Sequence, residues 1–432
     1  MTKEFFPCAT VLTIAILLLT VAPPIDAKEG AKPEVQLAAQ FQLPQLPGLG
    51  GAAVDWRQWD SFLTFIVKRL GQEIPPDLKE SLGEAFLDSR YELTNLVALL
   101  SAGENPVPQL LLDGWQRLSP IMKQALPALP KETADRYATF IGVLDQLAAL
   151  GQTSQLALLQ LSPDALREIA RILEPAATVD PLGYTLEIDN ALRDLLGLGA
   201  PIAAPAPGTR QSRLPAFPSL SKIREGSLRS LRFGVAMAAE PDLKKLNEWV
   251  PEDSDLEAYL LAVRSLLTAL SEKLATKTQL AKEHEPLARQ IILTAGWQES
   301  CWRQFVKKGK LLMPLASASG ALGLMQVSPQ TWRNLYDLKQ LGADIEYNGS
   351  AGAEILLYYL TRFALKKNED KQPGGDLARA TYSAYNGGPS QLSRYRAAKR
   401  NPESKKVDEA FWEKYQAVRS GREMEVLQCY KK

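Results

Sequence analysis

The chain has 432 residues, too many for one ordinary domain, and 46% of them are hydrophobic, so we expect a globular protein of two to three domains. Its 50 Lys and Arg nearly balance its 49 Asp and Glu, which gives no general electrostatic reason to expect nucleic acid as a partner. The single histidine, His284, belongs to no Cys/His cluster with ligand spacing. We therefore expect neither a metal site nor another cofactor.

Residues 1–27 have the features of an export signal. Val11 to Ala22 is an apolar run of twelve residues without a charge, shorter than the roughly twenty that a membrane-spanning helix needs. Two prolines end the run, and Ala27 offers a small residue for cleavage. We expect export to the periplasm or cell envelope. An uncleaved N-terminal membrane tether is the alternative.

The remaining chain divides by composition. Residues 28–52 are rich in Pro, Gln and Gly and predict an extended or disordered tether. Residues 53–198 have helical periodicity and predict a helical domain without a chemical motif. Residues 199–222 contain five prolines and predict a linker. We expect bridging helices over 223–280 and a mostly helical catalytic domain over 281–432, so the fold class is mainly α.

The expected helices of residues 53–198 are separated by breaks that contain Pro or Gly. One has Trp56, Trp59, Leu63, Ile66 and Leu70 on a single face, and another begins at Leu78 with Asp77 as its N-cap. The others are expected at 107–129, 131–150, 162–173 and 185–198. A further helix is expected over about 254–281, with Leu256, Tyr259, Leu260, Val263, Leu267, Leu270 and Leu274 buried.

Cleavage of the signal would remove Cys8 and leave two cysteines, Cys301 and Cys429. In an oxidising compartment an even pair favours a disulfide, so we predict that these two residues are bonded.

The segment 287–302 predicts a helix with one buried face. Apolar residues recur at three- and four-residue intervals, and the same steps lead to Glu299 and then to Trp302. Burial disfavours an ionised carboxyl, so Glu299 is expected to keep its proton above its usual pKa and to be suited to general acid catalysis. The alternative is a structural glutamate at a helix end.

Two further segments carry polar and small residues in tight turns. The first is Ser317-x-x-Gly320-Ala321-x-Gly323-Leu324-Met325-Gln326, whose glycines permit close approach of the backbone to a ligand or helix. The second is Ala384-Tyr385-Asn386-Gly387-Gly388-Pro389, which ends a helical stretch and offers a phenol and an amide for sugar binding.

Together with Glu299-Ser300 and Asn348-x-x-x-Gly352, these segments resemble the lytic transglycosylases of the soluble, SLT-domain type, relatives of goose-type lysozyme. The resemblance covers about residues 283–400. It implies a lysozyme-like catalytic domain that cleaves the β-1,4 bond between MurNAc and GlcNAc in peptidoglycan glycan strands and yields a 1,6-anhydromuramyl product. The remaining helical domain has no such resemblance and could bind other cell-envelope proteins.

The resemblance also implies roles for individual residues. Glu299 would be the general acid and base. Ser317, Met325 and Gln326 would line the sugar-binding cleft, Tyr385 would hold the Glu299 carboxyl by a hydrogen bond, and Asn386 would bind an N-acetyl or hydroxyl group. For Met325 a packing role is the alternative, and for Asn348 and Gly352 packing is the expected role. The chain departs from the family pattern at residues 307–312, which predict an additional loop at the rim of the cleft.

Two other functions remain open. The first is a lysozyme-type hydrolase, which would need a second carboxylate such as Asp344 or Glu346 to activate water. The second is a non-catalytic protein that binds peptidoglycan and recruits partners through its helical half.

Overall fold

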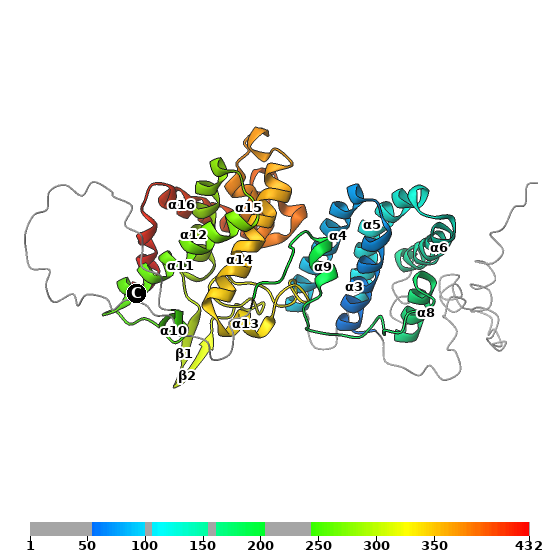
Figure 1. Ribbon diagram of the computed structural model, residues 1–432, viewed down its shortest axis with the longest axis horizontal. Coiled ribbons are helices and arrows are strands. Elements are labelled where there is room, and N and C mark those ends of the chain that lie inside the picture. Colours follow the sequence, from blue (N-terminus) through cyan, green and yellow to red (C-terminus); the bar gives the residue numbers. More distant parts are fainter. Residues whose placement is uncertain (1–53, 100–105, 154–160, 204–242, 432) are drawn as a thin grey trace, which may run out of the picture. The chain divides into compact units, whose positions relative to one another are not determined.

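The computed structural model describes residues 54–99, 106–153, 161–203 and 243–431, and nearly all of its regular elements are helices (Figure 1). The expected signal, the tether and most of the expected linker lie outside these residues. The chain forms two compact units, of which unit 1 reaches to Ala200 and also includes Arg333–Leu335, while unit 2 holds the rest. Among the described residues, no helix is both long and apolar enough to cross a bilayer.

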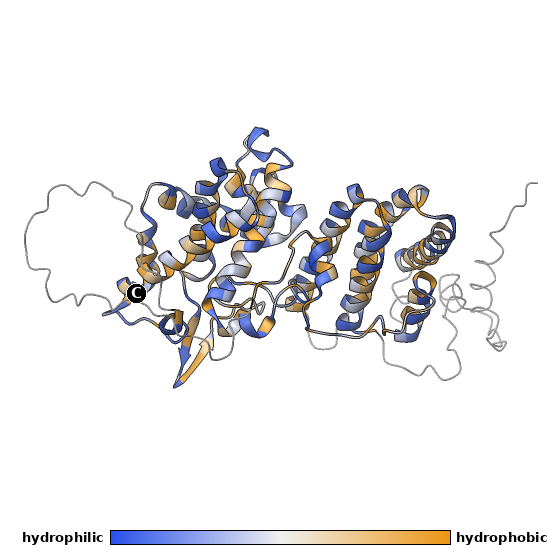
Figure 2. Cartoon of the chain, viewed as in Figure 1, coloured by the Kyte–Doolittle hydropathy of each residue, from blue (hydrophilic) through white to orange (hydrophobic). Residues whose placement is uncertain are grey.

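Unit 1 is a helical bundle. Its elements are α3 (Trp56–Glu73), α4 (Pro76–Leu99), α5 (Val107–Ala125), η1 (Leu126–Ala128), α6 (Lys131–Thr153), α8 (Pro163–Leu173) and α9 (Asn190–Leu195). From α3 to α8 each α-helix packs on the next one, α8 returns to pack on α3, and α9 packs on α3 and α4. The apolar stripes of these helices form a common core, and the polar faces lie outward (Figure 2).

Helix starts in unit 1 follow from capping side chains. Asp55 accepts hydrogen bonds from the first-turn amides of α3, and Gln58 accepts one from the Asp55 amide, which completes a capping box. Ser162 caps α8 and Asp189 caps α9 in the same manner. The predicted N-cap at Asp77 is wrong, because α4 begins at Pro76 and Asp77 lies in its first turn. The predicted helix 185–198 is reduced to the six residues of α9.

A buried ionic cluster joins distant parts of the sequence within unit 1. Asp60 is only 1% exposed and accepts hydrogen bonds from Arg90 Nε at 3.0 Å and Arg333 Nε at 2.7 Å. The Asn334 amide group donates to the Thr185 and Glu187 carbonyls, and Arg193 donates to the Leu335 carbonyl at 2.7 Å. Three residues from late in the chain therefore supply part of the interior of unit 1.

Unit 2 contains the remaining helices and a two-stranded antiparallel sheet. Its elements are α10 (Leu243–Leu246), α11 (Leu256–Lys277), η3 (Lys282–His284), α12 (Glu285–Ser300), β1 (Phe305–Lys308), β2 (Leu311–Pro314), α13 (Leu338–Ala343), α14 (Ile345–Tyr359), η4 (Leu360–Leu365), η5 (Glu369–Lys371), α15 (Leu377–Gly387), η6 (Pro389–Gln391), η7 (Arg394–Arg396), α16 (Pro402–Arg419) and η8 (Glu423–Tyr430).

Helix α12 lies in the middle of unit 2, where it packs on α11, α14, α15 and α16. All seven residues predicted for the buried face of α11 are buried. Helix α11 packs on α12 and α14 and belongs to unit 2. The predicted additional loop at 307–312 is ordered as the tip of the β1–β2 hairpin.

We predict that Asp60→Asn destabilises unit 1 by about 3 to 5 kcal/mol, because it leaves the guanidinium groups of Arg90 and Arg333 buried without their carboxylate. Hydrogen exchange of the α3 and α4 amides measures the effect in unit 1 alone. Asp164→Asn is the matched control: it removes an exposed partner of Arg167 and is expected to change stability by less than about 1 kcal/mol. Equal protection from hydrogen exchange in Asp60→Asn and Asp164→Asn would show that the buried Asp60 carboxylate does not stabilise unit 1.

Candidate functional site

Glu299 lies in the last turn of α12, and its environment matches the sequence-based expectation of a protonated acid. The side chain is partly exposed, and burial of the carboxyl raises its pKa to about 7. A hydrogen bond from Tyr382 and the positive charge of Lys414 act in the opposite direction and limit this rise. The carboxyl is therefore close to half protonated at neutral pH.

Tyr382 on α15 is the hydrogen-bond donor to this acid. Its hydroxyl donates to Glu299 Oε1 at 2.7 Å. Burial, followed by the negative charge of Glu299, raises the pKa of Tyr382 well above its usual value, so the phenol keeps its proton and remains a donor. The family resemblance predicts this role for Tyr385, but the Tyr385 hydroxyl donates to the Met325 carbonyl at 2.5 Å. Tyr382 lies three residues earlier, on the same face of the helix.

An aromatic stack fixes the ring of Tyr382. Phe411 on α16 lies parallel to it, with ring centroids 4.0 Å apart and an interplanar angle of 3°. Tyr415 continues the stack from Phe411 at 6.1 Å. Because α16 also packs directly on α12, one helix positions both the acid and its hydrogen-bond donor.

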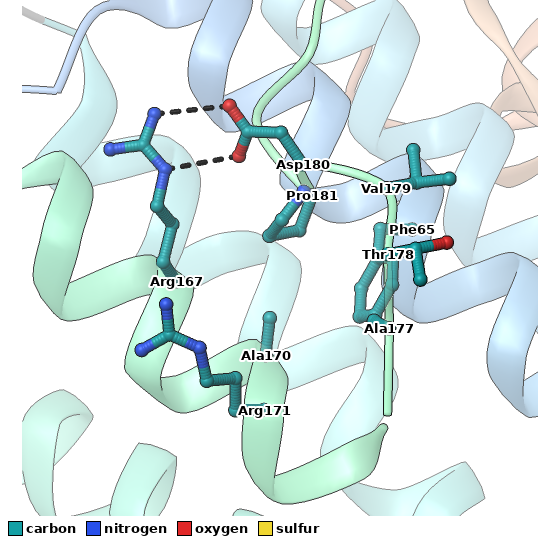
Figure 3. A pocket seen from close by; sticks show the side chains of 9 residues that line it. All are labelled: Phe65, Arg167, Ala170, Arg171, Ala177, Thr178, Val179, Asp180 and Pro181. Carbon is teal, nitrogen blue, oxygen red and sulfur yellow. Dashed lines mark hydrogen bonds and ion pairs between the residues drawn. The ribbon is translucent and has the colours of Figure 1, made fainter. Parts of the chain in front are cut away.

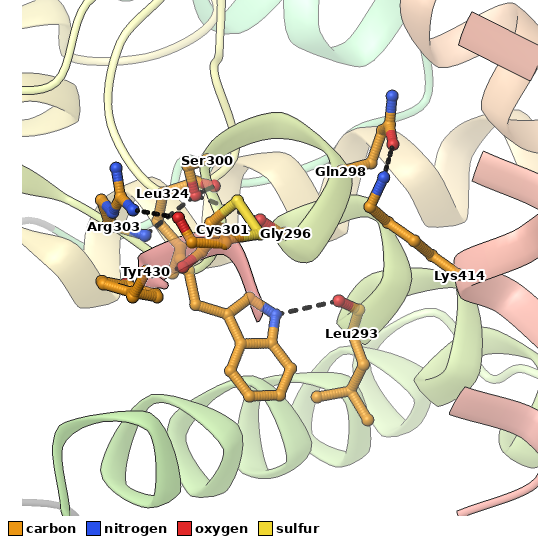
Figure 4. Close-up of a disulfide and its surroundings, with 11 residues drawn as sticks. Leu293, Gly296, Gln298, Ser300, Cys301, Arg303, Leu324, Lys414 and Tyr430 are labelled. Carbon is orange, nitrogen blue, oxygen red and sulfur yellow. Dashed lines mark hydrogen bonds between the residues drawn. A yellow bond between two sulfur atoms is a disulfide. The ribbon is translucent and has the colours of Figure 1, made fainter. Parts of the chain in front are cut away.

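Lys414 on α16 is the basic residue whose positive charge lowers the pKa of Glu299. Its ammonium group donates to Gln298 Oε1 at 2.7 Å, on the helix that carries the acid (Figure 4). Partial burial lowers the pKa of Lys414, and the nearby carboxylates of Glu413 and Glu299 oppose this effect. Helical periodicity does not distinguish this lysine from the other charged residues of its helix.

Residues 315–327 follow the hairpin and have irregular structure. Buried side chains form hydrogen bonds with the backbone amide and carbonyl groups of this segment. Ser300 Oγ donates to the Leu324 carbonyl at 2.6 Å. Gln304 accepts from the Leu324 amide and Asn348 from the Met325 amide, each at 2.8 Å. Both residues also donate to the Leu341 carbonyl. Asn348 therefore has the structural role that we predicted, while the contribution of Gln304 was missed.

Glycine is required at the centre of this network. Gly323 has φ of +72°, and a Cβ there would lie 2.3 Å from Gln304 Oε1 and 2.6 Å from Asn348 Nδ2. At Gly352 a Cβ would lie 2.3 Å from Met325 Cβ, so this glycine makes room for the methionine. The motif glycines thus permit close packing of the 315–327 segment on α14.

The predicted sugar-binding residues fall into different environments. Ser317 is exposed, and its hydroxyl accepts from the Ala321 amide at 3.0 Å. Gln326 is partly exposed, has a left-handed backbone with φ of 48°, and donates to the Gly323 carbonyl at 2.8 Å. Met325 is 0% exposed, so its side chain packs in the core in this structure. Asn386 is exposed, and its Oδ1 accepts from Arg394 at 3.2 Å, which directs its amide nitrogen away from that contact.

The carboxylates considered for water activation are placed differently. Asp344 is 2% exposed and caps α14, accepting from the Tyr347 amide and from Asn247 Nδ2, each at 2.8 Å. Glu346 lies partly exposed in the first turn of α14. Within the described ranges, no three His, Cys, Asp or Glu side chains form a group that could hold a metal ion.

The end of α12 is unusual in its backbone. Cys301 and Trp302 have φ of 53° and 62°, a left-handed conformation that side chains rarely adopt. The periodicity predicts that Trp302 continues the apolar face of α12. Trp302 instead lies beyond the end of that helix and is buried there. Its indole donates to the Leu293 carbonyl at 3.0 Å (Figure 4).

The predicted disulfide is present and secures this turn. Cys301 and Cys429 are bonded with a Cα separation of 6.2 Å (Figure 4). They lie 128 residues apart in the sequence. In a chain-entropy account, a cross-link over this distance lowers the entropy of the unfolded chain and so stabilises the folded state by about 4 to 5 kcal/mol. Arg303 lies over the Tyr430 ring at 4.1 Å, and Tyr430 donates to the Cys301 carbonyl at 2.8 Å. The C-terminal segment is thereby attached beside Glu299.

Unit 1 has an open surface pocket of about 250 Å³ (Figure 3). Arg167 on its wall makes two parallel hydrogen bonds of 3.0 Å to Asp180 and a third, of 2.8 Å, to Asp164. Two carboxylates therefore satisfy this guanidinium.

Comparison with known proteins gives a match to a family model. Residues 277–407 match the family model described as the transglycosylase SLT domain. The matched region runs from the end of α11 into α16 and contains Glu299, Tyr382 and the 315–327 segment. No curated protein and no solved structure matches the chain.

We predict that Glu299→Gln stabilises unit 2 at alkaline pH. The folded-state pKa of about 7 exceeds the value of about 4.3 expected for an unfolded chain, so folding favours the protonated form. Stability from this group is complete below about pH 4 and is lost as the pH rises through 7. At pH 9 the neutral glutamine should therefore be more stable, by on the order of 2 kcal/mol.

Urea unfolding of wild type and variant at several pH values measures this difference, and the two are expected to have similar stability at about pH 4. Glu285→Gln, at the exposed start of the same helix, is the control and should show no such pH-dependent gain. A constant difference between wild type and Glu299→Gln across the range would contradict the raised pKa.

Proposed function

We propose that this chain, whose residues 277–407 form a transglycosylase SLT domain, is a peptidoglycan lytic transglycosylase with Glu299 as its general acid and base. The domain match supports action on peptidoglycan. The observation that carries the assignment of the acid is the Glu299 carboxyl, whose pKa is about 7 and which receives its hydrogen bond from Tyr382.

The proposed reaction has two proton transfers. The neutral Glu299 carboxyl donates its proton to the glycosidic oxygen as the bond from that oxygen to C1 of MurNAc breaks. The carboxylate then accepts the proton of the MurNAc C6 hydroxyl, whose oxygen bonds to C1. The products are a shortened glycan with a free GlcNAc 4-hydroxyl and a 1,6-anhydromuramyl end. No water is consumed, and Glu299 returns to its neutral form.

The placement of one candidate carboxylate, Asp344, counts against hydrolysis. Inverting hydrolases use a second carboxylate as base, and retaining ones use it as nucleophile. Asp344 is buried and occupied as the cap of α14, so it is a poor candidate for either task. Attack by the C6 hydroxyl of the substrate itself needs no second carboxylate, because an intramolecular nucleophile has a high effective concentration.

Roles for the other parts of the chain belong to the same proposal. Ser317, Gln326 and Asn386 would contact the glycan, and Asn386 would offer its amide nitrogen to an N-acetyl carbonyl because Arg394 occupies its oxygen. Export to the periplasm or cell envelope through residues 1–27 would bring the enzyme to its substrate. The helical residues 53–198 would bind other envelope proteins.

We predict that Glu299→Gln lowers the rate of glycan cleavage by about 10² to 10⁴-fold, the usual contribution of general acid catalysis. Release of soluble muropeptides from purified insoluble peptidoglycan measures the rate, and mass spectrometry identifies the product, because a hydrolytic product is heavier by one water. Glu285→Gln is the matched control and should cleave as wild type. Full activity in Glu299→Gln would refute the role of this residue.

Two other results would favour the alternatives. Products heavier by one water would indicate a hydrolase. Retention of the wild-type protein on insoluble peptidoglycan without release of soluble sugars would indicate a non-catalytic binding protein.

We predict that Tyr382→Phe shifts the alkaline limb of the pH–rate profile upward by about one unit. The phenol stabilises the ionised carboxylate of Glu299, so its removal lets the acid keep its proton to higher pH. The pH dependence of kcat/KM measures the shift. Tyr385→Phe is the control, because that hydroxyl donates to the Met325 carbonyl. If the alkaline limb of the pH–rate profile is unchanged in Tyr382→Phe, the Tyr382 hydroxyl does not stabilise the Glu299 carboxylate.

A further inference from the structure

The tip of the β1–β2 hairpin exposes an unusual run of residues. All seven from Lys307 to Met313 are exposed, and the run contains three lysines and no acidic residue. Its large apolar side chains are also open to solvent: Leu311 is 68% exposed, Leu312 41% and Met313 40%. Three consecutive exposed residues of this size form an apolar patch, unlike single exposed leucines, which are common on protein surfaces.

The register separates the two kinds of side chain by strand. Lys307 pairs with Leu312 and Lys308 pairs with Leu311, so each lysine of β1 lies opposite a leucine of β2. The exposed end of β2 is therefore apolar, and the exposed end of β1 is cationic, with Lys310 in the turn. Figure 2 shows the hydrophobic strand beside the more hydrophilic one. Apolar side chains lie on both faces of the tip, because Leu311 and Leu312 point to opposite sides.

The turn and the base of the hairpin both stabilise this arrangement. Gly309 has φ of +63° at the first position of a two-residue turn, where glycine is favoured. At the base, Phe305 is 5% exposed and pairs with Pro314, which packs near Gly342. The apolar patch is thus presented by an ordered element with a buried base.

The charges on the tip itself are all positive, and one of them has an exposed acidic partner. Lys307 approaches Glu252 at 3.6 Å, an exposed ion pair of small energetic value. Residues 243–257 carry exposed charges of both signs, with Lys244 and Lys245 against Glu248, Glu252, Asp253 and Glu257. Lys308 and Lys310 lie beside the apolar patch itself.

We propose that the β1–β2 hairpin binds the surface of a membrane that contains anionic lipids. Exposed aliphatic side chains beside lysines suit the boundary between headgroups and acyl chains, where the apolar groups leave water and the ammonium groups contact lipid phosphates. The long stems of the lysines allow their charges to stay at headgroup level while the leucines enter the boundary. This contact is independent of the chemistry at Glu299.

Vesicle co-sedimentation tests this proposal. The protein begins at Lys28, which removes the apolar run 11–22 and keeps every described residue. The probes are vesicles of phosphatidylcholine alone and of phosphatidylcholine and phosphatidylglycerol in equal parts. Wild type should bind the mixed vesicles, and high salt should weaken this binding because it screens the lysines.

Two hairpin variants separate the contributions. Replacing Lys307, Lys308 and Lys310 by Gln should weaken binding to the mixed vesicles about a hundredfold, since each lysine near an anionic surface contributes about fivefold. Replacing Leu311, Leu312 and Met313 by Ser should weaken it by about tenfold or more. The matched control replaces exposed Leu261 by Ser and exposed Lys273 by Gln on α11 and should bind as wild type.

Several results would overturn the proposal. They are equal binding by wild type and both hairpin variants, equal binding of wild type to the two kinds of vesicle, and absence of binding. Hairpin-dependent self-association without lipid would show that a second copy is the partner. Loss of retention on insoluble peptidoglycan in the variants, with unchanged vesicle binding, would make the hairpin a glycan contact. Glu299→Gln should bind vesicles as wild type, so failure of the proposed catalytic function would leave this test intact.

Discussion

The hydrogen bond from Tyr382 to Glu299 depends on the packing of three helices. Helix α12 supplies the acid, α15 supplies the phenol, and α16 packs on both. Phe411 on α16 stacks on the Tyr382 ring at 4.0 Å, which fixes the direction of the hydroxyl. Side chains locked by packing in this way can hold a reacting group in one geometry, which loops achieve less well. The carboxyl is then exposed enough to reach a ligand and buried enough for its neutral form to be favoured.

The chain after α12 has little regular secondary structure, so side chains must supply the hydrogen bonds that hold its backbone in place. Buried backbone amides and carbonyls need partners, and here the amide groups of Gln304 and Asn348 provide them. Gly323 is the consequence, since any side chain would occupy the space of these two groups. The left-handed turn at Cys301 is held by the bond to Cys429 and by the Tyr430 hydroxyl. The sequence immediately after the acid is therefore fixed from several directions.

The sequence predicted those features that depend on local pattern. Helical periodicity located α3 to α8 and the buried face of α11, and the even pair of cysteines indicated the disulfide. It did not identify Tyr382 as the donor to Glu299, because that contact joins residues 83 apart and depends on how α15 and α16 pack. The inclusion of Arg333–Leu335 in unit 1 was missed for the same reason: Arg333 and Asp60 are 273 positions apart. Met325 belonged to a recognisable motif, but only its packing against Gly352 revealed that its side chain is buried.

The pKa of Glu299 suits the proposed role, in which one group acts first as an acid and then as a base. Burial alone would raise the pKa until the carboxylate became costly to form, and the second proton transfer would then be easy but the first slow. Tyr382 and Lys414 both favour the carboxylate and so oppose burial. The balance near 7 means that neither form is strongly preferred at neutral pH, so one residue can release a proton and recover it within a single turnover. In the proposed reaction no second carboxylate is then required, and Asp344 is free to serve as the cap of α14.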